Sequence, residues 1–79
     1  MNQLNLYSHP DCHLCEEAEA LMHRCGMGDA YQIVDIENDP ELLKRYGIHV
    51  PVLKRKDNQK ELFWPFDRVA LIAFVGEQM

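Results

Sequence analysis

Positive charge is scarce in this sequence of 79 residues. It has 8 lysines and arginines against 13 aspartates and glutamates, so its formal net charge is −5 at pH 7. A protein that binds nucleic acid mainly through the phosphates needs a surplus of lysine and arginine. We therefore do not expect nucleic acid to be the main partner.

Long apolar runs are also missing. No stretch approaches the ~18 consecutive apolar residues that are needed to span a membrane, and Met1-Asn2-Gln3 lacks the basic start of a signal peptide. The sequence contains no internal repeat, no low-complexity tract and no linker rich in proline, glycine or serine. We expect a single domain over residues 1–79, no membrane association, a monomer and a cytoplasmic location.

The chain has no even set of cysteines; it has three. An odd number of cysteines without a signal peptide argues against a secreted disulfide scaffold. Cys12 and Cys15 have the C-x-x-C spacing, which lets two sulfurs reach bonding distance across the first turn of a helix. Cys25 fits the apolar stripe of the same helix and is expected to be a buried core thiol.

Hydrophobic patterning predicts the order βαβαββα. Residues 4–7 and 31–36 are predicted strands on either side of a helix that ends at Gly26, and such a unit implies parallel pairing with a right-handed crossover. Asp39 is expected to cap a short second helix with Pro40 at its first position. The remaining predicted elements are a third strand entered through residues 48–53, a polar hairpin at 54–60, a fourth strand at 61–63 and a last helix capped by Asp67.

Apolar spacing also predicts which helical side chains face inward. They are Leu14, Ala18, Leu21, Met22 and Cys25 in the first helix, Leu42, Leu43 and Tyr46 in the second, and Val69, Leu71, Ile72, Phe74 and Val75 in the third. The basic residues of the hairpin, Lys54, Arg55, Lys56 and Lys60, are expected to be solvated and to blunt a sheet edge.

The position of the cysteines at a helix start predicts dithiol–disulfide chemistry. The unpaired N–H groups and the partial positive charge of the helix N-terminus stabilise a thiolate at Cys12, so its pKa is expected below the ~8.5 of free cysteine. Cys12 is thus the predicted nucleophile and Cys15 the resolving thiol. His13 would favour the thiolate when protonated, but an exposed histidine without a role explains it equally well.

Two motifs resemble the glutaredoxins of the thioredoxin-fold superfamily, and more narrowly the small bacterial glutaredoxin-like proteins with Cys-x-Leu-Cys. One is Tyr7-Ser8-His9-Pro10-Asp11-Cys12-His13-Leu14-Cys15, and the other is Val50-Pro51. The resemblance implies an α/β fold with a four-stranded mixed sheet of order 2-1-3-4, one helix on one face and two on the other. It also implies that Pro51 is cis, lies beside the cysteine pair and leaves the Val50 backbone free to pair with a thiol substrate.

The region that would hold glutathione departs from the family pattern. The family's Gly-Gly pair is missing, and Trp64-Pro65-Phe66-Asp67 stands in its place. Asp67 either holds the amine of glutathione or only caps the last helix. Trp64 and Phe66 fit a hydrophobic lip for a substrate and core packing equally well. Glutathione is expected to be a poor ligand.

These observations predict a thiol–disulfide oxidoreductase that acts on protein disulfides. It needs no tightly bound cofactor and receives electrons from glutathione or a reductase protein. One alternative is a metal-binding or metal-delivery module using Cys12 and Cys15, with or without His13. Zinc is less favoured because the further candidate ligands, His23 and Cys25, lie one helix length away. The other alternative is a non-catalytic interaction domain with the thioredoxin fold.

Overall fold

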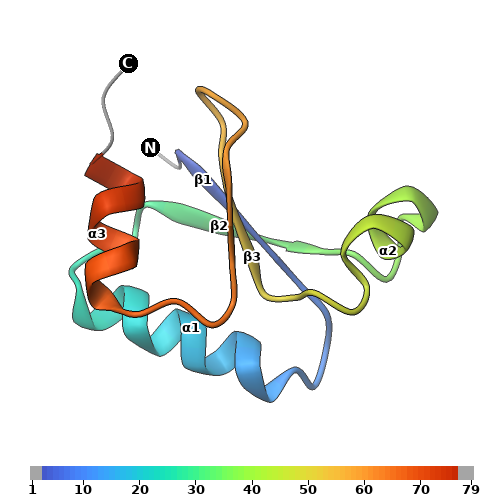
Figure 1. The fold of residues 1–79 in the computed structure, drawn as a ribbon. Coiled ribbons are helices and arrows are strands. Elements are labelled where there is room, and N and C mark those ends of the chain that lie inside the picture. The colour runs from blue at the N-terminus through green and yellow to red at the C-terminus, as the bar shows by residue number, and fades with distance from the viewer. Residues whose placement is uncertain (1–2, 77–79) are drawn as a thin grey trace.

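The computed structural model describes residues 3–76 and contains four strands and three helices (Figure 1). The elements are β1 (Leu4–Ser8), α1 (His13–Arg24), β2 (Tyr31–Asp35), α2 (Pro40–Tyr46), β3 (Val52–Arg55), β4 (Glu61–Phe63) and α3 (Arg68–Gly76). The predicted order βαβαββα is confirmed. No helix within residues 3–76 is both long and apolar enough to cross a membrane.

The four strands form one mixed sheet in the order β2-β1-β3-β4. The β1 strand pairs in parallel with β2 and antiparallel with β3, which in turn pairs antiparallel with β4. The sheet order implied by the resemblance is therefore confirmed. β1 is central because it is apolar on both faces: Leu4 and Leu6 belong to one core cluster and Tyr7 to the other.

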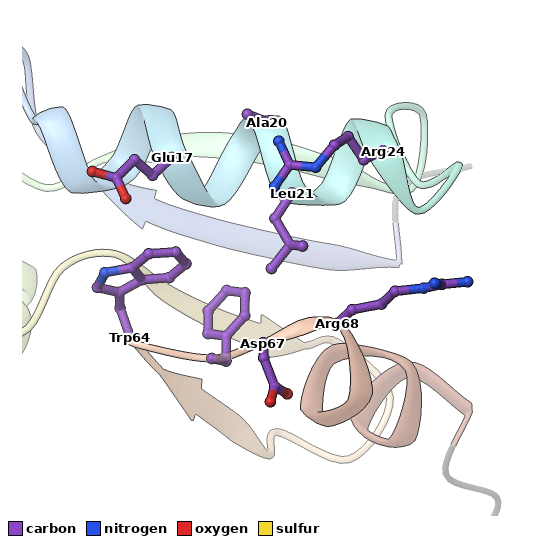
Figure 2. A pocket seen from close by; sticks show the side chains of 8 residues that line it. Glu17, Ala20, Leu21, Arg24, Trp64, Asp67 and Arg68 are labelled. Carbon is purple, nitrogen blue, oxygen red and sulfur yellow. The ribbon is translucent and has the colours of Figure 1, made fainter.

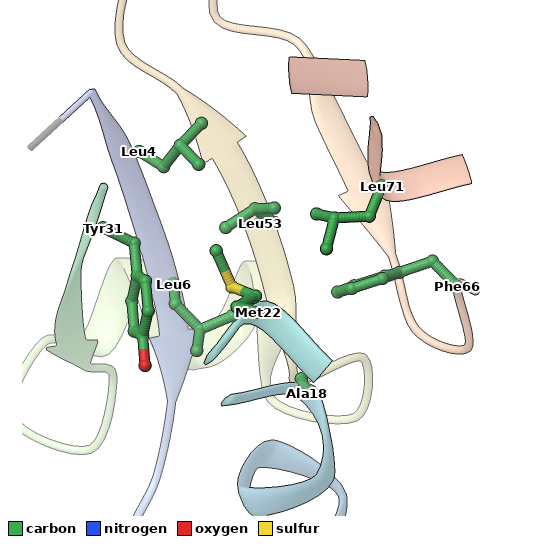
Figure 3. Close-up of a cluster of buried hydrophobic side chains, with 8 residues drawn as sticks. All are labelled: Leu4, Leu6, Ala18, Met22, Tyr31, Leu53, Phe66 and Leu71. Carbon is green, nitrogen blue, oxygen red and sulfur yellow. The ribbon is translucent and has the colours of Figure 1, made fainter. Parts of the chain in front are cut away.

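Two clusters of buried side chains lie on opposite faces of the sheet. The larger cluster joins the sheet to α1 and α3, and the smaller joins it to α2, so helices cover both faces as expected (Figures 1 and 3). The larger cluster contains Leu4, Leu6, Ala18, Met22, Tyr31, Leu53, Phe66 and Leu71. The smaller contains Tyr7, Ile36, Tyr46 and Val52.

The predicted helix ends are confirmed by their caps. The Asp39 side chain accepts hydrogen bonds from the N–H groups of Glu41 and Leu42, and Pro40 begins α2. The Asp67 side chain accepts a bond of 2.8 Å from the Ala70 N–H at the start of α3. Gly26 follows α1 with a φ of 75°, a conformation that glycine adopts without strain.

Several inward-facing assignments are wrong. Leu14, Leu43, Val69 and Ile72 are exposed rather than packed on the sheet. In α1 the buried residues are Cys15, Ala18 and Met22; Leu14 lies at the edge of this stripe, about 40° from Ala18 but about 100° from Cys15 around the helix axis. In α3 only Leu71 is fully buried, because a helix of two to three turns presents one side to the sheet.

Arg55 corrects the expectation of a fully solvated hairpin. Its side chain is only 10% exposed and lies between the hairpin and α3. The guanidinium donates to both carboxylate oxygens of Asp57 and, over 2.8 Å, to the backbone carbonyl of Phe74. Arg55 therefore joins β3 to the last turns of α3.

Candidate functional site

The cysteine pair lies where the chain passes from β1 to α1. Cys12 is the N-cap of α1 with extended backbone angles, and the preceding Asp11 has a positive φ of 60°. The Cα atoms of Cys12 and Cys15 are 5.2 Å apart and the two sulfurs form a disulfide. Both residues are buried, with 8% of Cys12 and 3% of Cys15 exposed, so Cys12 is the slightly more accessible member.

A backbone hydrogen bond acts on the sulfur of Cys12. The Cys15 N–H donates to Cys12 Sγ over 3.1 Å, which satisfies one of the N–H groups that the first turn of a helix leaves without a partner. A donor in this position favours the charged form of a sulfur acceptor, and so does the partial positive charge of the helix end. The reduced form of Cys12 is thus placed to hold a thiolate.

His13 begins α1, but its ring is directed along the surface of the helix. Its side chain is 84% exposed, and Nε2 lies 3.1 Å from a carboxylate oxygen of Glu17, one turn further on. The pairing of residues i and i+4 gives this histidine a contact of its own on the helix surface. The structure therefore provides a partner for His13 other than the two sulfurs.

The Val50-Pro51 peptide bond is cis, as expected from the resemblance. The antiparallel register pairs Tyr7 with Val52, so Pro51 stands at the end of the sheet from which β1 leads to Cys12. Pro51 is fully buried, and its carbonyl accepts a hydrogen bond from the Trp64 N–H. Trp64 is thereby tied to the same end of the sheet. Direct contact between Pro51 and the cysteine pair stays a prediction.

The Val50 backbone is only half available to a substrate. Its N–H donates to the carbonyl of Tyr46 over 3.1 Å, and the His49 N–H donates to the same oxygen over 2.8 Å. The expectation of a wholly free Val50 backbone is therefore wrong for the N–H in this conformation. The Val50 carbonyl accepts no hydrogen bond from residues 3–76 and remains open to a donor.

A groove of about 400 Å³ runs between α1 and the segment that joins β4 to α3 (Figure 2). Leu21 points from α1 toward the β4–α3 segment (Figure 2), while Trp64 and Phe66 meet edge to face with ring centroids 5.0 Å apart. Phe66 is buried in the larger core cluster, whereas Trp64 packs against that cluster and stays partly exposed. Core packing therefore applies to Phe66, and a role of Trp64 as a lip for a substrate stays a prediction.

The charged residues of this groove were not singled out from the sequence, apart from Asp67. Asp67 points away from α1 and caps α3, so its carboxylate is already engaged (Figure 2). Arg24 and Arg68 line the groove at the end of α1 and the start of α3. The sequence gives only a weak indication of this groove. Glu17, Leu21 and Arg24 have the spacing of one helix face, but no local pattern shows that the β4–α3 segment lies opposite them.

The further candidate metal ligands lie at the far end of α1. His23 Nε2 is 3.4 Å from the hydroxyl of Tyr31, which also donates to Glu19, and Cys25 is half-buried against the larger core cluster. Within residues 3–76 no group of three or more histidine, cysteine, aspartate or glutamate side chains is arranged to hold a metal ion. His23 and Cys25 are thus about one helix length away from Cys12.

Comparison with known proteins identifies close structural relatives. The X-ray structure of the structural genomics target protein XcR50 from X. campestris is 39% identical, with a TM-score of 0.81 over 91% of this chain and 93% of that chain. Its solution structure gives 40% identity and a TM-score of 0.82 over 92% and 91% of the two chains. Protein Ne2328 from Nitrosomonas europaea is 28% identical, with a TM-score of 0.78 over 91% and 88%.

No curated protein matches the chain. A family model described as "Glutaredoxin-like domain (DUF836)" matches residues 3–76, which include both motifs and every element of the fold. With its Cys12–Cys15 pair at disulfide distance on a thioredoxin-like fold, the chain belongs to the glutaredoxin-like domain family.

Proposed function

We propose that this protein is a thiol–disulfide oxidoreductase that reduces protein disulfides through Cys12 and Cys15. The observation that carries the proposal is the hydrogen bond from the Cys15 N–H to Cys12 Sγ at the N-terminus of α1. It combines a sulfur that can hold negative charge with a second thiol close enough to form a disulfide with it. A purely structural disulfide needs no donor that favours a thiolate, but a dithiol that alternates between its reduced and oxidised forms does.

The reaction has two exchange steps. The Cys12 thiolate attacks one sulfur of the substrate disulfide, so that a bond between Cys12 and the substrate forms and the other substrate sulfur leaves as a thiolate, which takes a proton from water. Cys15 then loses its proton and attacks Cys12 Sγ, which releases the second substrate thiol. The substrate gains two electrons, and the protein loses them as the Cys12–Cys15 disulfide forms.

The surroundings of the pair support an extended protein segment as substrate. The open carbonyl of Val50 can accept one backbone hydrogen bond from such a segment, and the neighbouring groove can receive its side chains. The exposed ring of His13, which pairs with Glu17 in this structure, binds the substrate segment beside the cysteine pair. Pro51 shapes the end of the sheet against which the segment would lie.

A complete cycle also needs a source of electrons that reduces the protein again. Glutathione or a reductase protein returns two electrons to the Cys12–Cys15 disulfide, and no tightly bound cofactor takes part. We further propose that the protein works in the cytoplasm as a monomer. A reducing compartment supplies the thiols that such a cycle consumes.

Turnover of insulin and trapping of an intermediate test the proposal together. The wild-type protein should reduce insulin catalytically with dithiothreitol as electron source. The Cys15→Ser variant should accumulate a mixed disulfide at Cys12, because the resolving thiol is gone, and the Cys12→Ser variant should do neither. Cys25→Ser is the matched control and should keep full turnover. Equal activity of the Cys12→Ser variant and the wild type would refute the proposal.

A further inference from the structure

Tyr46, the last residue of α2, contacts three separate parts of the chain. Its side chain is buried, and its ring stacks on that of Tyr7 with the ring centroids 4.7 Å apart and the ring planes 16° from parallel. Its hydroxyl donates a hydrogen bond to a carboxylate oxygen of Glu61 on β4. Its backbone carbonyl accepts both hydrogen bonds from the turn that follows α2. One buried residue thus joins β1, β4 and the segment that leads to Pro51.

The position of α2 depends on these contacts of Tyr46. The helix has only 7 residues, and a helix this short is not stable by itself in water. Tyr46 is its only buried residue, so this side chain is its main attachment to the sheet. Stacking on Tyr7 restrains the plane of the ring, and the bond to Glu61 restrains the ring within that plane. A ring that is held at its far end also holds the backbone that carries it.

The Tyr46 carbonyl in turn orients the peptide groups before Pro51. The N–H groups of His49 and Val50 donate to this one oxygen over 2.8 Å and 3.1 Å. The two bonds fix the direction of the Val50 backbone, and the Val50 carbonyl is the acceptor that we assign to a protein substrate. On its other side, the Tyr46 ring packs on Tyr7, one residue before the end of the strand that leads to Cys12. Tyr46 therefore lies between the two parts of the chain that the substrate would have to meet together.

We propose that Tyr46 is a positioning residue for protein substrates, and this inference rests on the proposed function. Its hydrogen-bonded ring holds the turn of residues 47–50 so that the Val50 carbonyl accepts a backbone N–H of the substrate while the substrate sulfur reacts with Cys12. Because Tyr46 is buried, it acts through the turn and not by contact with the substrate. Loss of its hydroxyl should therefore raise the KM for a protein disulfide and leave the reactivity of Cys12 unchanged.

The structure offers a matched pair of variants for the test. Tyr46→Phe removes the hydroxyl and keeps the ring that stacks on Tyr7, so this variant should fold. Tyr31→Phe is the control, because Tyr31 is also buried and donates to a glutamate, Glu19, over 3.0 Å. Tyr31 pairs with Leu4 at the start of β1, at the other end of the strand from the loop to Cys12. Each variant loses one bond between a phenol and a carboxylate, so both should lose similar global stability.

Two disulfide substrates separate positioning from chemistry. One is insulin, and the other is bis(2-hydroxyethyl) disulfide, which has no peptide N–H to offer to the Val50 carbonyl. Tyr46→Phe should lose about tenfold in kcat/KM with insulin, mainly through KM, and less than about twofold with the small disulfide. Tyr31→Phe should match the wild type with both substrates. Glu61→Ala should reproduce the loss with insulin, whereas Glu61→Gln should largely avoid it, because its amide oxygen can still accept the bond from Tyr46.

Hydrogen exchange followed by NMR tests the positioning without any redox reaction. The N–H groups of His49 and Val50 should exchange about tenfold faster in Tyr46→Phe than in Tyr31→Phe. Equal exchange in the two variants would overturn the inference and leave the proposed function intact, and so would an equal loss of Tyr46→Phe with both disulfides. If the wild type does not reduce insulin, the proposed function fails, and the exchange rates alone decide whether Tyr46 holds the turn.

Discussion

At the residue scale, the chemistry depends on how differently the three sulfurs are placed. Cys12 caps α1 and accepts a hydrogen bond from the Cys15 N–H, whereas Cys15 lies within the first turn and Cys25 follows the last. Only Cys12 therefore combines a helix N-terminus with a donor that favours a thiolate. The three thiols should differ in reactivity once the disulfide is reduced.

We predict that limited alkylation of the reduced protein near neutral pH labels Cys12 before the other two cysteines. The thiolate is the reactive species, and the helix end raises its fraction at Cys12. Peptide mapping by mass spectrometry identifies the labelled residue. The denatured protein is the control and should react at all three sites at similar rates. Faster labelling of Cys15 or Cys25 in the folded protein would reverse the assignment of nucleophile.

Residues carried by a local motif could be found from the sequence alone. Cys12 and Cys15 follow from their spacing, and Pro51 from the resemblance, since a local sequence by itself favours a trans bond. The bond from the Val50 N–H to the Tyr46 carbonyl could not be found in this way. It depends on how the turn after α2 closes, and no residue type in that turn encodes it.

At the scale of elements, α3 is held by a side chain from another part of the chain. Arg55 on β3 donates to the Phe74 carbonyl near the end of α3 and to the carboxylate of Asp57 in the hairpin. The last carbonyls of a helix have no partner within it, and a cation there also interacts favourably with the helix dipole. Arg55 thus stabilises the C-terminal part of α3 from another element.

We predict that Arg55→Ala lowers the free energy of unfolding by about 2 kcal/mol or more, because a buried side chain is removed and a partly buried carbonyl loses its donor. Urea denaturation followed by circular dichroism measures the change. Lys56→Ala is the matched control, since Lys56 is an exposed neighbour, and should change stability by less than about 0.5 kcal/mol. Similar effects of the two substitutions would show that Arg55 does not anchor α3.

The bounds of the helices and strands could be predicted where capping residues and turns mark their ends. It was harder to predict which side of each helix is buried. Asp39, Pro40 and Asp67 signal helix starts through local hydrogen bonding, and the structure uses them in that way. Which side of α3 faces the sheet depends on the path from Phe63 to Arg68. With apolar residues on every side of that helix, Leu71 could not be distinguished from Val69 or Ile72 by spacing.

At the scale of the whole molecule, each face of the sheet buries a tyrosine that is bonded to a glutamate. Tyr31 donates to Glu19 on the face of α1, and Tyr46 donates to Glu61 on the face of α2. Burial first, and then the bond to the carboxylate, raises the pKa of Tyr31 to about 12 and that of Tyr46 to about 12. The neutral phenols are therefore part of both cores.

We predict an alkaline loss of stability from these two tyrosines. Their pKa values are about 12 when folded and 10.0 as the ordinary value. A raised pKa contributes stability that is complete below the ordinary value and is lost as pH rises through the folded one. The melting temperature should thus fall between pH 10 and 12, and less steeply in Tyr31→Phe/Tyr46→Phe. An equally steep fall in the double variant would assign the loss to other groups.

Recognition of glutathione needs several parts of the molecule at once. The Val50 N–H is bonded to Tyr46, the Asp67 carboxylate caps α3, and Pro65 has no N–H to offer. Losing two or three hydrogen bonds to charged groups, at about 1.5–3 kcal/mol each, weakens binding by about a hundredfold or more. We therefore expect a glutathionylated peptide to be reduced with at least about tenfold lower kcat/KM than a protein disulfide. Both substrates can be compared with one electron donor, and the Cys25→Ser variant should show the same ratio as the wild type. Reduction of the glutathione adduct as efficient as that of the protein disulfide would contradict this expectation.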